Sequence, residues 1–435
     1  MTIDNYRQLI EKTKTVVLKY KIEKIIGMVI ESTGPKADIG TLCKIFTSKN
    51  DRYILAEIVG FNQEKTMLMP FEDLTGVGPG SIIESTGDVL KIPVGDCLIG
   101  RIINGFGDII DDKQILPTQE MEFYSVQNVP SNPLSRPVIS ERINIGVKAI
   151  DGFLTCGKGQ RMGIFSGSGV GKSTLMGMIS RNIEADVNVI ALVGERGREV
   201  RDFMEKNLRE EGMKKSVLVV ATSDQPAMMR LKCALVATTI AEYFKDQGKD
   251  VLLMMDSLTR FAMAQREIGL AIGEPPVARG YTPSIYSMLP KLLERSGNFK
   301  KGSITGIYTV LVEGDDVNEP ISDTVRGIID GHIVLSRTVA MRNHYPAIDI
   351  LASISRIMNE IVDPQHVQLA GQIRDLLSTY YENLDLISIG AYKSGSNKKI
   401  DKAIQCIDSI NKFLKQDVNE KYSYEDTISL LQTLI

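Results

Sequence analysis

The stretch that decides the fold is Phe165-Ser-Gly-Ser-Gly-Val-Gly-Lys-Ser-Thr174, in one-letter code FSGSGVGKST. The apolar run MGIF ends at Phe165, and the helix-like run KSTLMGMIS begins at Lys172. A glycine-rich loop between a strand and a helix directs backbone N–H groups at phosphate oxygens, at the positive end of the helix dipole. The stretch therefore predicts a phosphate-binding loop in an α/β domain.

The loop departs from the strict pattern G-x-x-x-x-G-K-[ST] at one position, where Ser166 replaces the first glycine. A small residue is compatible with the strand exit, and the remaining glycines permit positive φ and a close approach of the backbone. We expect Lys172 to reach the β- and γ-phosphates and Ser173 to ligate Mg²⁺. The predicted nucleotide-binding residues are Ser166, Gly167, Ser168, Gly169, Val170, Gly171, Lys172, Ser173 and Thr174.

Hydrolysis of a bound nucleotide requires further groups, and two apolar runs supply them. The run VLLMMD ends in Asp256, which is suited to hold Mg²⁺ through its water shell. The run VIALVGERGREV carries Glu195 and Arg196, and Glu195 would face the γ-phosphate if the predicted strands 162–165 and 187–193 lie in one sheet. The alternative that Glu195 and Arg196 form a surface ion pair remains open at this point.

The composition bounds the class of protein. The chain has 435 residues, 43% of them hydrophobic and 24% charged, which indicates a soluble, globular protein of two or three domains. A net charge of −3 argues against a dedicated nucleic-acid binder. The five cysteines form no CxxC pair and the three histidines lack ligand spacing, so we expect reduced thiols, a cytoplasmic location and no structural zinc. We identify no signal peptide and no membrane-spanning run.

The chain changes character along its length. Residues 3–19 show helical spacing and predict an N-terminal amphipathic helix within 1–20, either docked on a partner or membrane or packed on its own domain. Residues 21–92 hold short β-rich runs, which predict a small antiparallel barrel or sandwich with turns at 76–81 and 85–88.

Apolar strand-like runs and helical stretches alternate over residues 93–364. This alternation predicts a parallel sheet covered on both faces. Residues 365–435 predict a helical domain, with a helical stripe of apolar residues that contains Ile400, Ala403, Ile404, Ile407 and Leu414. The predicted strands of the middle part are 162–165, 187–193, 216–220, 251–255, 303–312 and 331–336, and 229–244 is a predicted helix.

Six sequence blocks together identify a family resemblance. They are GSGVGKST, GERGREV, MDSLTRFAMAQREIGLAIGEPP, VLVEGDD, DGHIVLSR and HYPAID…SISR, in this order. The chain resembles the type III secretion and flagellar export ATPases, which are relatives of the catalytic subunits of rotary ATP synthases. The resemblance runs from about residue 24 to about residue 415.

The resemblance implies an N-terminal β-barrel, a RecA-like P-loop core and a C-terminal helical domain. It implies a homohexameric ring with ATP sites between subunits. Glu195 matches the catalytic glutamate, Arg356 in SISR matches the arginine finger that acts on the neighbour's nucleotide, and Tyr345 in HYPAID matches an aromatic packed on adenine. Arg196 is expected to position the γ-phosphate or Glu195, and a small residue at position 166 is tolerated in this family.

The resemblance further implies a Mg²⁺-dependent ATPase that assists delivery and unfolding of export substrates at the membrane gate. The stretch ISIGAYKSGSNKKIDKAI favours the flagellar branch over the virulence branch. Expected partners are stator-like and central-stalk proteins, export substrates with their chaperones, and the export gate, at the cytoplasmic face of the membrane. The alternatives are a noncatalytic ring subunit, which Glu195 opposes, and an RNA-stimulated translocase, which the acidic composition opposes.

Overall fold

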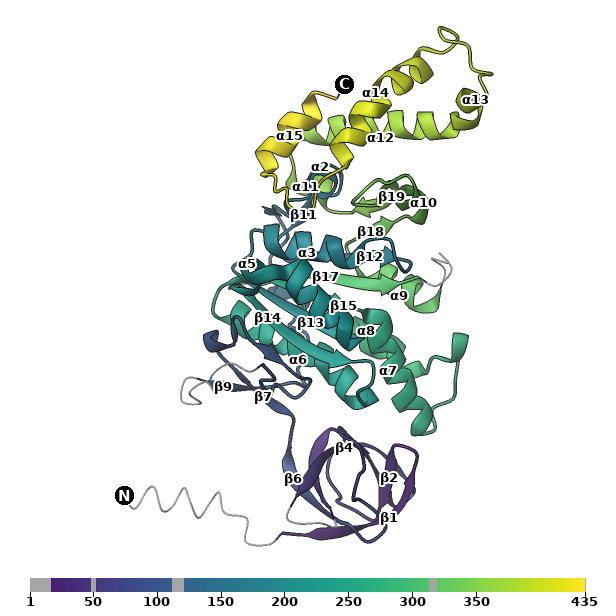
Figure 1. The fold of residues 1–435 in the computed structure, drawn as a ribbon. Coiled ribbons are helices and arrows are strands. Elements are labelled where there is room, and N and C mark those ends of the chain that lie inside the picture. The colour runs from purple at the N-terminus through teal and green to yellow at the C-terminus, as the bar shows by residue number, and fades with distance from the viewer. Residues whose placement is uncertain (1–16, 48–51, 112–120, 313–318, 435) are drawn as a thin grey trace, which may run out of the picture.

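The structure is a computed structural model that describes residues 17–47, 52–111, 121–312 and 319–434. Figure 1 shows a β-barrel at one end, a layered α/β core in the middle and a group of helices at the other end. This arrangement confirms the three-part fold class expected from the sequence. The predicted N-terminal helix lies outside the described residues up to residue 16, and at its other end Lys19 begins a strand.

The N-terminal part is a closed barrel with the strand order β1-β2-β5-β4-β3-β6. Along β3 buried and half-buried residues alternate, so that every second side chain points into the barrel. Closure pairs β1 with both β2 and β6, which leaves the sheet without open edges. The strands are β1 (Lys19–Ile26), β2 (Val29–Ser32), β3 (Thr41–Phe46), β4 (Tyr53–Asn62), β5 (Lys65–Pro70) and β6 (Ile82–Val89).

One turn predicted in the barrel is wrong. Residues 85–88, with the sequence STGD, lie inside β6 rather than between strands. The pairing of β6 with β3 shifts register here, because Cys43 pairs with Ser85 whereas Thr41 pairs with Val89. Gly87 has a φ of 74° within this irregularity. The turn-forming residues therefore mark a bulge in a continuous strand.

The core is a nine-stranded sheet whose main path runs β19-β18-β12-β17-β15-β13-β14-β8, with β16 paired to β17. The strands from β18 to β8 along this path are mutually parallel. The five strands between these two are buried along nearly their whole length, as the sequence predicts for strands covered by helices on both faces. The strands are β8 (Ile102–Ile103), β12 (Arg161–Ser166), β13 (Val187–Glu195), β14 (Ser216–Thr222), β15 (Asp250–Asp256), β16 (Gly297–Asn298), β17 (Ser303–Leu311), β18 (Gly331–Leu335) and β19 (Ile348–Ser355).

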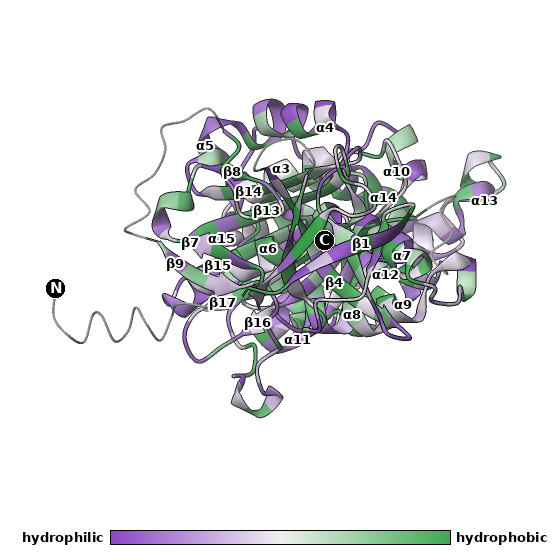
Figure 2. Ribbon diagram, turned by 90° about the horizontal axis from the view of Figure 1, so that it is seen from below, coloured by the Kyte–Doolittle hydropathy of each residue, from purple (hydrophilic) through white to green (hydrophobic). Residues whose placement is uncertain are grey.

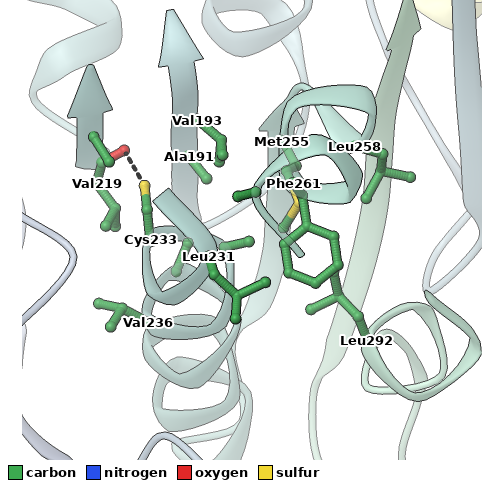
Figure 3. Close-up of a cluster of buried hydrophobic side chains, with 14 of the residues drawn as sticks. Ala191, Val193, Val219, Leu231, Cys233, Val236, Met255, Leu258, Phe261 and Leu292 are labelled. Atoms are coloured by element: carbon green, nitrogen blue, oxygen red, sulfur yellow. Dashed lines mark hydrogen bonds between the residues drawn. The ribbon is translucent and has the colours of Figure 1, made fainter. Parts of the chain in front are cut away.

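Helices cover both faces of this sheet. Figure 3 shows one interface, in which Leu231 and Cys233 of α6 meet Val193 and Val219 of the sheet, and the Cys233 thiol donates to the Val219 carbonyl at 3.4 Å. Seen from the barrel end (Figure 2), hydrophobic residues concentrate toward the middle of the molecule. The core helices are α2 (Lys148–Phe153), α3 (Lys172–Asn182), α4 (Gly197–Asp202), the π-helical turn η4 (Phe203–Leu208), α5 (Arg209–Met213), α6 (Ala227–Asp246), α7 (Leu258–Ala271), α8 (Pro283–Leu293), α9 (Pro320–Ile328), α10 (Arg337–Met341) and α11 (Met358–Ile361).

The edge strand β19 differs from the expected parallel sheet, because it pairs antiparallel with β18. Its burial alternates only in part, and Leu351 and Ile354 are exposed. The sequence analysis assigned no strand to residues 348–355, since this edge strand lacks the continuous apolar run of the central strands. Its reversed direction places its carboxyl end at the sheet edge opposite to that of the parallel strands.

Short elements connect the barrel to the core, and the predicted domain boundary between residues 92 and 93 falls inside one of them, β7. β7 pairs with β9 in a separate two-stranded sheet. These elements are β7 (Lys91–Val94), η1 (Asp96–Leu98), β9 (Glu122–Ser125), η3 (Pro133–Ser135), β10 (Arg142–Ile143) and β11 (Cys156–Gly157), and the core also holds η5 (Ala278–Gly280).

The C-terminal part is helical, with α12 (Pro364–Glu382), α13 (Leu384–Ser388), α14 (Lys398–Leu414) and α15 (Tyr424–Gln432). Asp363 and Asn397 cap α12 and α14 by accepting backbone N–H groups. Of the predicted apolar stripe, Ile404 is half-buried and the other four residues are buried. Phe413 packs edge-on against Phe153 of α2, with ring centroids 6.1 Å apart, and so joins the helices to the core. Within the described part of the chain, the helices are too short or too polar to cross a bilayer.

A buried ion pair joins the barrel to the core. Lys232 of α6 lies 2.6 Å from the Glu57 carboxylate of β4, and their side chains are 3% and 9% exposed. We expect Lys232→Met to lower the free energy of unfolding by about 3–5 kcal/mol, because it leaves a buried carboxylate without a partner. Denaturant unfolding followed by circular dichroism measures this loss.

Two control variants separate burial of an unpaired charge from loss of an ion pair as such. Lys399→Met breaks the exposed pair with Asp375, which should change stability by less than about 1 kcal/mol. The double variant Lys232→Met with Glu57→Leu removes both buried charges and should recover most of the lost stability. Equal losses in the Lys232 and Lys399 single variants would contradict the expectation.

Candidate active site

The phosphate-binding loop connects β12 to α3 at the carboxyl edge of the sheet. β12 ends at Ser166, and α3 begins at Lys172 after Gly171. Gly169 and Gly171 adopt φ values of 77° and 91°, which residues with a Cβ rarely adopt. The local geometry is therefore that of the predicted strand–loop–helix unit.

The position of Ser166 explains why the loop tolerates a residue other than glycine at the first position of the strict pattern. It is the last residue of β12, paired with Leu311 of β17 and Leu335 of β18, so its backbone is extended. An extended residue needs no positive φ, and a side chain is tolerated there. The side chain is buried, and its hydroxyl has no hydrogen-bond partner among the described residues.

Lys172, Glu195 and Asp256 form a compact cluster beside this loop. Glu195 and Asp256 end the neighbouring parallel strands β13 and β15, so both carboxylates reach the same edge of the sheet as the loop. Lys172 Nζ donates to Asp256 and lies 3.9 Å from Glu195 Oε1. Thr309 of β17 donates its hydroxyl to Asp256 at 2.7 Å and fixes that carboxylate. The three charged residues predicted from separate motifs are thus brought together.

The pKa of Glu195 is raised to about 8. Burial is the main cause, and the negative charge of Asp256 and a hydrogen bond with Glu199 add to it, whereas Lys172 opposes it. The buried Asp256 and the half-buried Glu195 share one lysine, so the cluster has a net negative charge when both are ionised, which disfavours ionisation of the second carboxylate. Glu195 is therefore poised to accept a proton near neutral pH.

This shift predicts the pH dependence of catalysis. A carboxylate that acts as a base works only when it is deprotonated, so kcat/KM for ATP hydrolysis should rise with pH and level off above an apparent pKa near 8. Glu199→Ala removes a hydrogen bond and a charge that raise this pKa, so it should move the rise to lower pH. Steady-state kinetics from pH 5.5 to 9.5 would measure both. A rise that does not move in Glu199→Ala would contradict the assignment.

The remaining loop residues lie at the mouth of the site. Ser173 and Thr174 are exposed in the first turn of α3, and Ser168 and Gly169 are exposed in the loop itself. Val170 is buried and anchors the loop to the core beneath it. The hydroxyl of Ser173 therefore faces the open side of the loop, where a phosphate-bound cation would lie.

Tyr345 lies next to the loop. A Cβ atom built on Gly171 would be 3.5 Å from Cδ1 of Tyr345, and the tyrosine is 44% exposed. Tyr345 also lines a cavity of about 670 Å³ between the core and the C-terminal helices, together with Lys148, Phe413 and Gln416. The Tyr345 carbonyl accepts the N–H of Gln416 at 3.1 Å. An aromatic face beside a phosphate loop is suited to stack on a purine base.

Two predicted residues do not join the cluster within one chain. Arg196 has a side chain that is 82% exposed and lies 3.7 Å from Glu199, so the guanidinium does not contact Glu195. Arg356 follows β19 and is exposed, with its guanidinium on the Arg326 carbonyl at 3.2 Å. Because β19 runs antiparallel to β18, Arg356 lies at the sheet edge opposite to the phosphate loop.

The structure adds two residues that the sequence analysis did not single out. Thr309 orients Asp256, as described above. Arg260 lies in the first turn of α7 and packs against Gly194, where an added Cβ would lie 3.1 Å from the Arg260 Cβ. Its Nε atom is buried without a hydrogen-bond partner among the described residues. The only signal for Arg260 was its place in MDSLTRF, four residues after Asp256.

Family models match three stretches of the chain. Residues 22–87 match the β-barrel domain of the ATP synthase alpha/beta family, and residues 146–355 match its nucleotide-binding domain. Residues 362–433 match the C-terminal domain of the type III secretion system ATPase EscN. These ranges follow the barrel, core and helical parts of the structure.

Curated relatives match over nearly their full length. The chain is 55% identical to the flagellum-specific ATP synthase of Bacillus subtilis, covering 98% of this chain and 97% of the relative. It is 46% identical to the type 3 secretion system ATPase of Xanthomonas euvesicatoria, covering 95% and 93%. The structure of the assembled ATPase EscN of enteropathogenic E. coli superposes with a TM-score of 0.91 at 49% identity, covering 95% and 99%. EscN with its central stalk EscO gives a TM-score of 0.88 at 48% identity, with the same coverage of both chains.

Proposed function

The chain belongs to the ATP synthase alpha/beta family and is a P-loop ATPase of type III export, and on that premise we propose that it serves flagellar export and hydrolyses ATP at the cluster of Lys172, Glu195 and Asp256. The observation that carries the catalytic part is the position of this cluster, which lies at the carboxyl edge of the sheet beside the phosphate loop. The flagellar part rests on the flagellum-specific relatives at 55% and 49% identity.

In this proposal the loop and Lys172 hold the phosphates. The backbone N–H groups of residues 168–173 surround the phosphate oxygens, and Lys172 compensates the charge of the β- and γ-phosphates. Tyr345 stacks on adenine, in the cavity that it shares with Phe413. Residues 166 and 167 shape the strand exit and present no charge to the nucleotide.

The donor set fits Mg²⁺. The Ser173 hydroxyl and the Asp256 carboxylate are hard oxygen donors, and Mg²⁺ prefers one or two such groups together with phosphate oxygens and water. The raised pKa of Glu195 reflects excess negative charge and burial at this position, which a cation would offset. When bound, Mg²⁺ supplies neutralisation of the charge that develops on the β- and γ-phosphate oxygens.

Glu195 orients the attacking water and accepts its proton. Arg196 acts as a positioning residue through Glu199, which it contacts at 3.7 Å and which in turn hydrogen-bonds Glu195. Arg356 cannot serve the loop of its own chain from the opposite edge of the sheet, so it serves the site of a neighbouring copy. A head-to-tail contact of this kind gives a ring where the rotation between copies closes, and we propose a homohexamer.

The partners follow from the relatives. EscN has been solved with a central stalk, and we propose a stalk-like partner for the ring of this chain as well. The proposal extends to a stator-like regulator, to export substrates with their chaperones and to the export gate, with the ring held peripherally at the cytoplasmic face of the membrane. The assigned activity is ATP hydrolysis that assists delivery and unfolding of these substrates.

ATP turnover across a series of protein concentrations tests the enzyme and the ring together. With Mg²⁺ present, turnover per chain should climb steeply with concentration and then reach a plateau, because the site is complete only between copies. Chelation of Mg²⁺ should abolish it. Turnover per chain that is constant across the series would overturn the ring, and no turnover at any concentration would overturn the catalytic assignment.

The flagellar assignment has its own test. The chain, expressed in Bacillus subtilis cells that lack their flagellum-specific ATP synthase, should restore swimming. The matched control is the Glu195→Gln variant, which should not. If the wild-type chain hydrolyses ATP in vitro, binds the host export proteins and still leaves the cells immotile, the flagellar assignment fails and the virulence branch is favoured.

A further inference from the structure

A second cavity lies between the core and the C-terminal helices, next to the Tyr345 cavity, with which it shares Lys412 and Lys415. It consists of two adjoining hollows of about 620 and 530 Å³. Figure 1 shows α10 and β19 beneath α12 and α14, which supply its walls. The residues that line both hollows are Val339, Arg342, His344, Tyr381 and Asn411, and we call this space the α10–α14 cavity.

His344 lines this cavity and has one ring nitrogen without a hydrogen-bond partner. The residue is 8% exposed, and its Nε2 atom is buried without a hydrogen-bond partner. The pKa of His344 is lowered to about 4, mainly by burial and also by the charges of Lys415 and Arg342, against a hydrogen bond with the Leu414 backbone that raises it. The ring is therefore neutral at pH 7. If the other nitrogen donates to the Leu414 carbonyl, Nε2 carries a lone pair that requires a donor.

The wall of the cavity has an excess of positive charge. Arg342, Lys412 and Lys415 line it, and in the described part of the chain none of them lies within ion-pair distance of a carboxylate. Asp408 is the acidic residue of the larger hollow. Asp349 lines the smaller hollow, but its Oδ1 accepts the N–H groups of Leu351 and Ala352 at 3.0 Å.

The same cavity offers flat and apolar surface. The Arg342 guanidinium lies 5.3 Å from the centroid of the Tyr381 ring, and Tyr380 stands edge-on to Tyr381 at 5.6 Å. Leu377 and Ile348 line the smaller hollow, and Leu384 lines the larger one. A planar ring would stack on an arginine or tyrosine face here, with apolar side chains beneath it.

We propose that the α10–α14 cavity is a binding site for a small aromatic anion that also carries a hydroxyl or N–H donor. The anionic group meets Arg342, Lys412 and Lys415, the donor meets His344 Nε2, and the ring packs between Tyr381 and the apolar side chains. The anionic group, the donor and the ring of the ligand correspond, in this order, to the unpaired positive charges, to the unpartnered nitrogen of His344 and to the aromatic and apolar surface of the cavity.

The site is connected to the proposed nucleotide site, and this part of the inference rests on the proposed function. His344 directly precedes Tyr345, and Lys412 and Lys415 line both the α10–α14 cavity and the Tyr345 cavity. Gln416 follows them and donates its N–H to the Tyr345 carbonyl at 3.1 Å. An occupant that moves α14 or His344 therefore moves the adenine-stacking residue, so ligand and nucleotide should alter each other's affinity by the same factor.

Binding can be measured with a matched set of probes. The probe is 6-hydroxy-2-naphthoate, which carries ring, charge and donor, and the controls are 2-naphthoate without the donor and 2-naphthol without the charge. Isothermal titration calorimetry on the full-length chain, with Mg–ADP saturating the nucleotide site, should give one site per chain for the probe. Each control should bind at least about tenfold more weakly, the equivalent of one lost hydrogen bond or ion pair.

Variants place the probe in the cavity. Arg342→Gln changes an exposed side chain and should weaken 6-hydroxy-2-naphthoate at least about tenfold, with 2-naphthol unaffected. His344→Phe should weaken the probe but leave 2-naphthoate unchanged. Lys399→Gln, on an exposed pair of α14, is the matched control without effect. Equal affinity for all three compounds, or unchanged affinity in Arg342→Gln, overturns the proposal.

The coupling is tested separately from the binding. The affinity for ADP is measured with and without saturating probe, and the affinity for probe with and without ADP. If ADP and probe change each other's affinity by the same factor, and that factor differs from one, the connection through α14 is supported. If neither ligand changes the affinity for the other, the connection is overturned, but the proposed binding site is not. If ADP does not bind at all, the proposed function fails. Binding of the probe without nucleotide then still tests whether the α10–α14 cavity is a ligand site.

Discussion

Glu195→Gln is expected to lower kcat for ATP hydrolysis by about 10²–10⁴-fold, the usual contribution of a general base. The amide keeps the shape of the side chain but cannot accept the proton of the attacking water. Glu195 lies 3.9 Å from Lys172 at the carboxyl end of β13, beside the phosphate loop, so no neighbouring group of the cluster replaces it without moving. Single-turnover measurements with Mg–ATP separate this loss from any change in product release.

Nucleotide binding should survive this substitution. The amide removes a negative charge beside the γ-phosphate, so the Kd for Mg–ATP should stay the same or fall. The control variant is Glu205→Gln, which changes an exposed glutamate paired with Arg201 and should turn over like the wild type. Glu195→Gln with undiminished turnover would remove Glu195 as the base, whatever the state of assembly.

Arg356→Ala is expected to reduce turnover of the assembled protein by about 10³–10⁵-fold, the range for loss of an arginine finger. Binding of nucleotide by the isolated chain should be nearly unchanged, because Arg356 lies at the opposite edge of the sheet from its own loop. Light scattering verifies that the variant still assembles. A matched exposed arginine, Arg201 of α4, pairs with Glu205 of η4, and Arg201→Ala should leave turnover within a few-fold.

Mixing the two inactive variants distinguishes action in trans from action in cis. Glu195→Gln chains keep the arginine and Arg356→Ala chains keep the base, so a mixed contact can pair an intact base with an intact arginine. In an equal, random mixture about a quarter of the head-to-tail contacts have this pairing, and turnover should return to about that fraction of the wild type. No recovery, with assembly verified, would mean that Arg356 serves its own chain or serves no site.

The sequence predicted the layered core because each central strand is a continuous apolar run. In a domain of this size, such runs between helical stretches have few structural interpretations other than buried parallel strands. The same logic found Lys172, Glu195 and Asp256, since each follows or ends a strand, and parallel strands end at one edge. Once these strands are placed in one parallel sheet, the three side chains lie together at that edge.

Other parts of the site were beyond this reasoning. The edge strand β19 is exposed on one side, so its apolar pattern is too weak to predict, and its direction depends on pairing with β18. Thr309 sits in the middle of an apolar strand, and nothing in its surroundings marks it as a partner of Asp256. At residues 85–88 the error is the reverse, because turn-forming residues predicted a turn where the chain forms a bulge within the continuous strand β6. Local signals therefore found strand ends but missed long-range pairings.

The direction of β19 has a consequence for how much ATP unassembled copies would consume in the cell. In the proposed mechanism a solitary copy holds its base and its arginine on opposite edges of one sheet, so it should hydrolyse ATP about 10³–10⁵-fold more slowly than an assembled copy. Newly made copies would then accumulate and diffuse without draining the nucleotide pool, and rapid ATP hydrolysis would begin only where copies meet. A single antiparallel pairing would thus restrict where in the cell the motor runs.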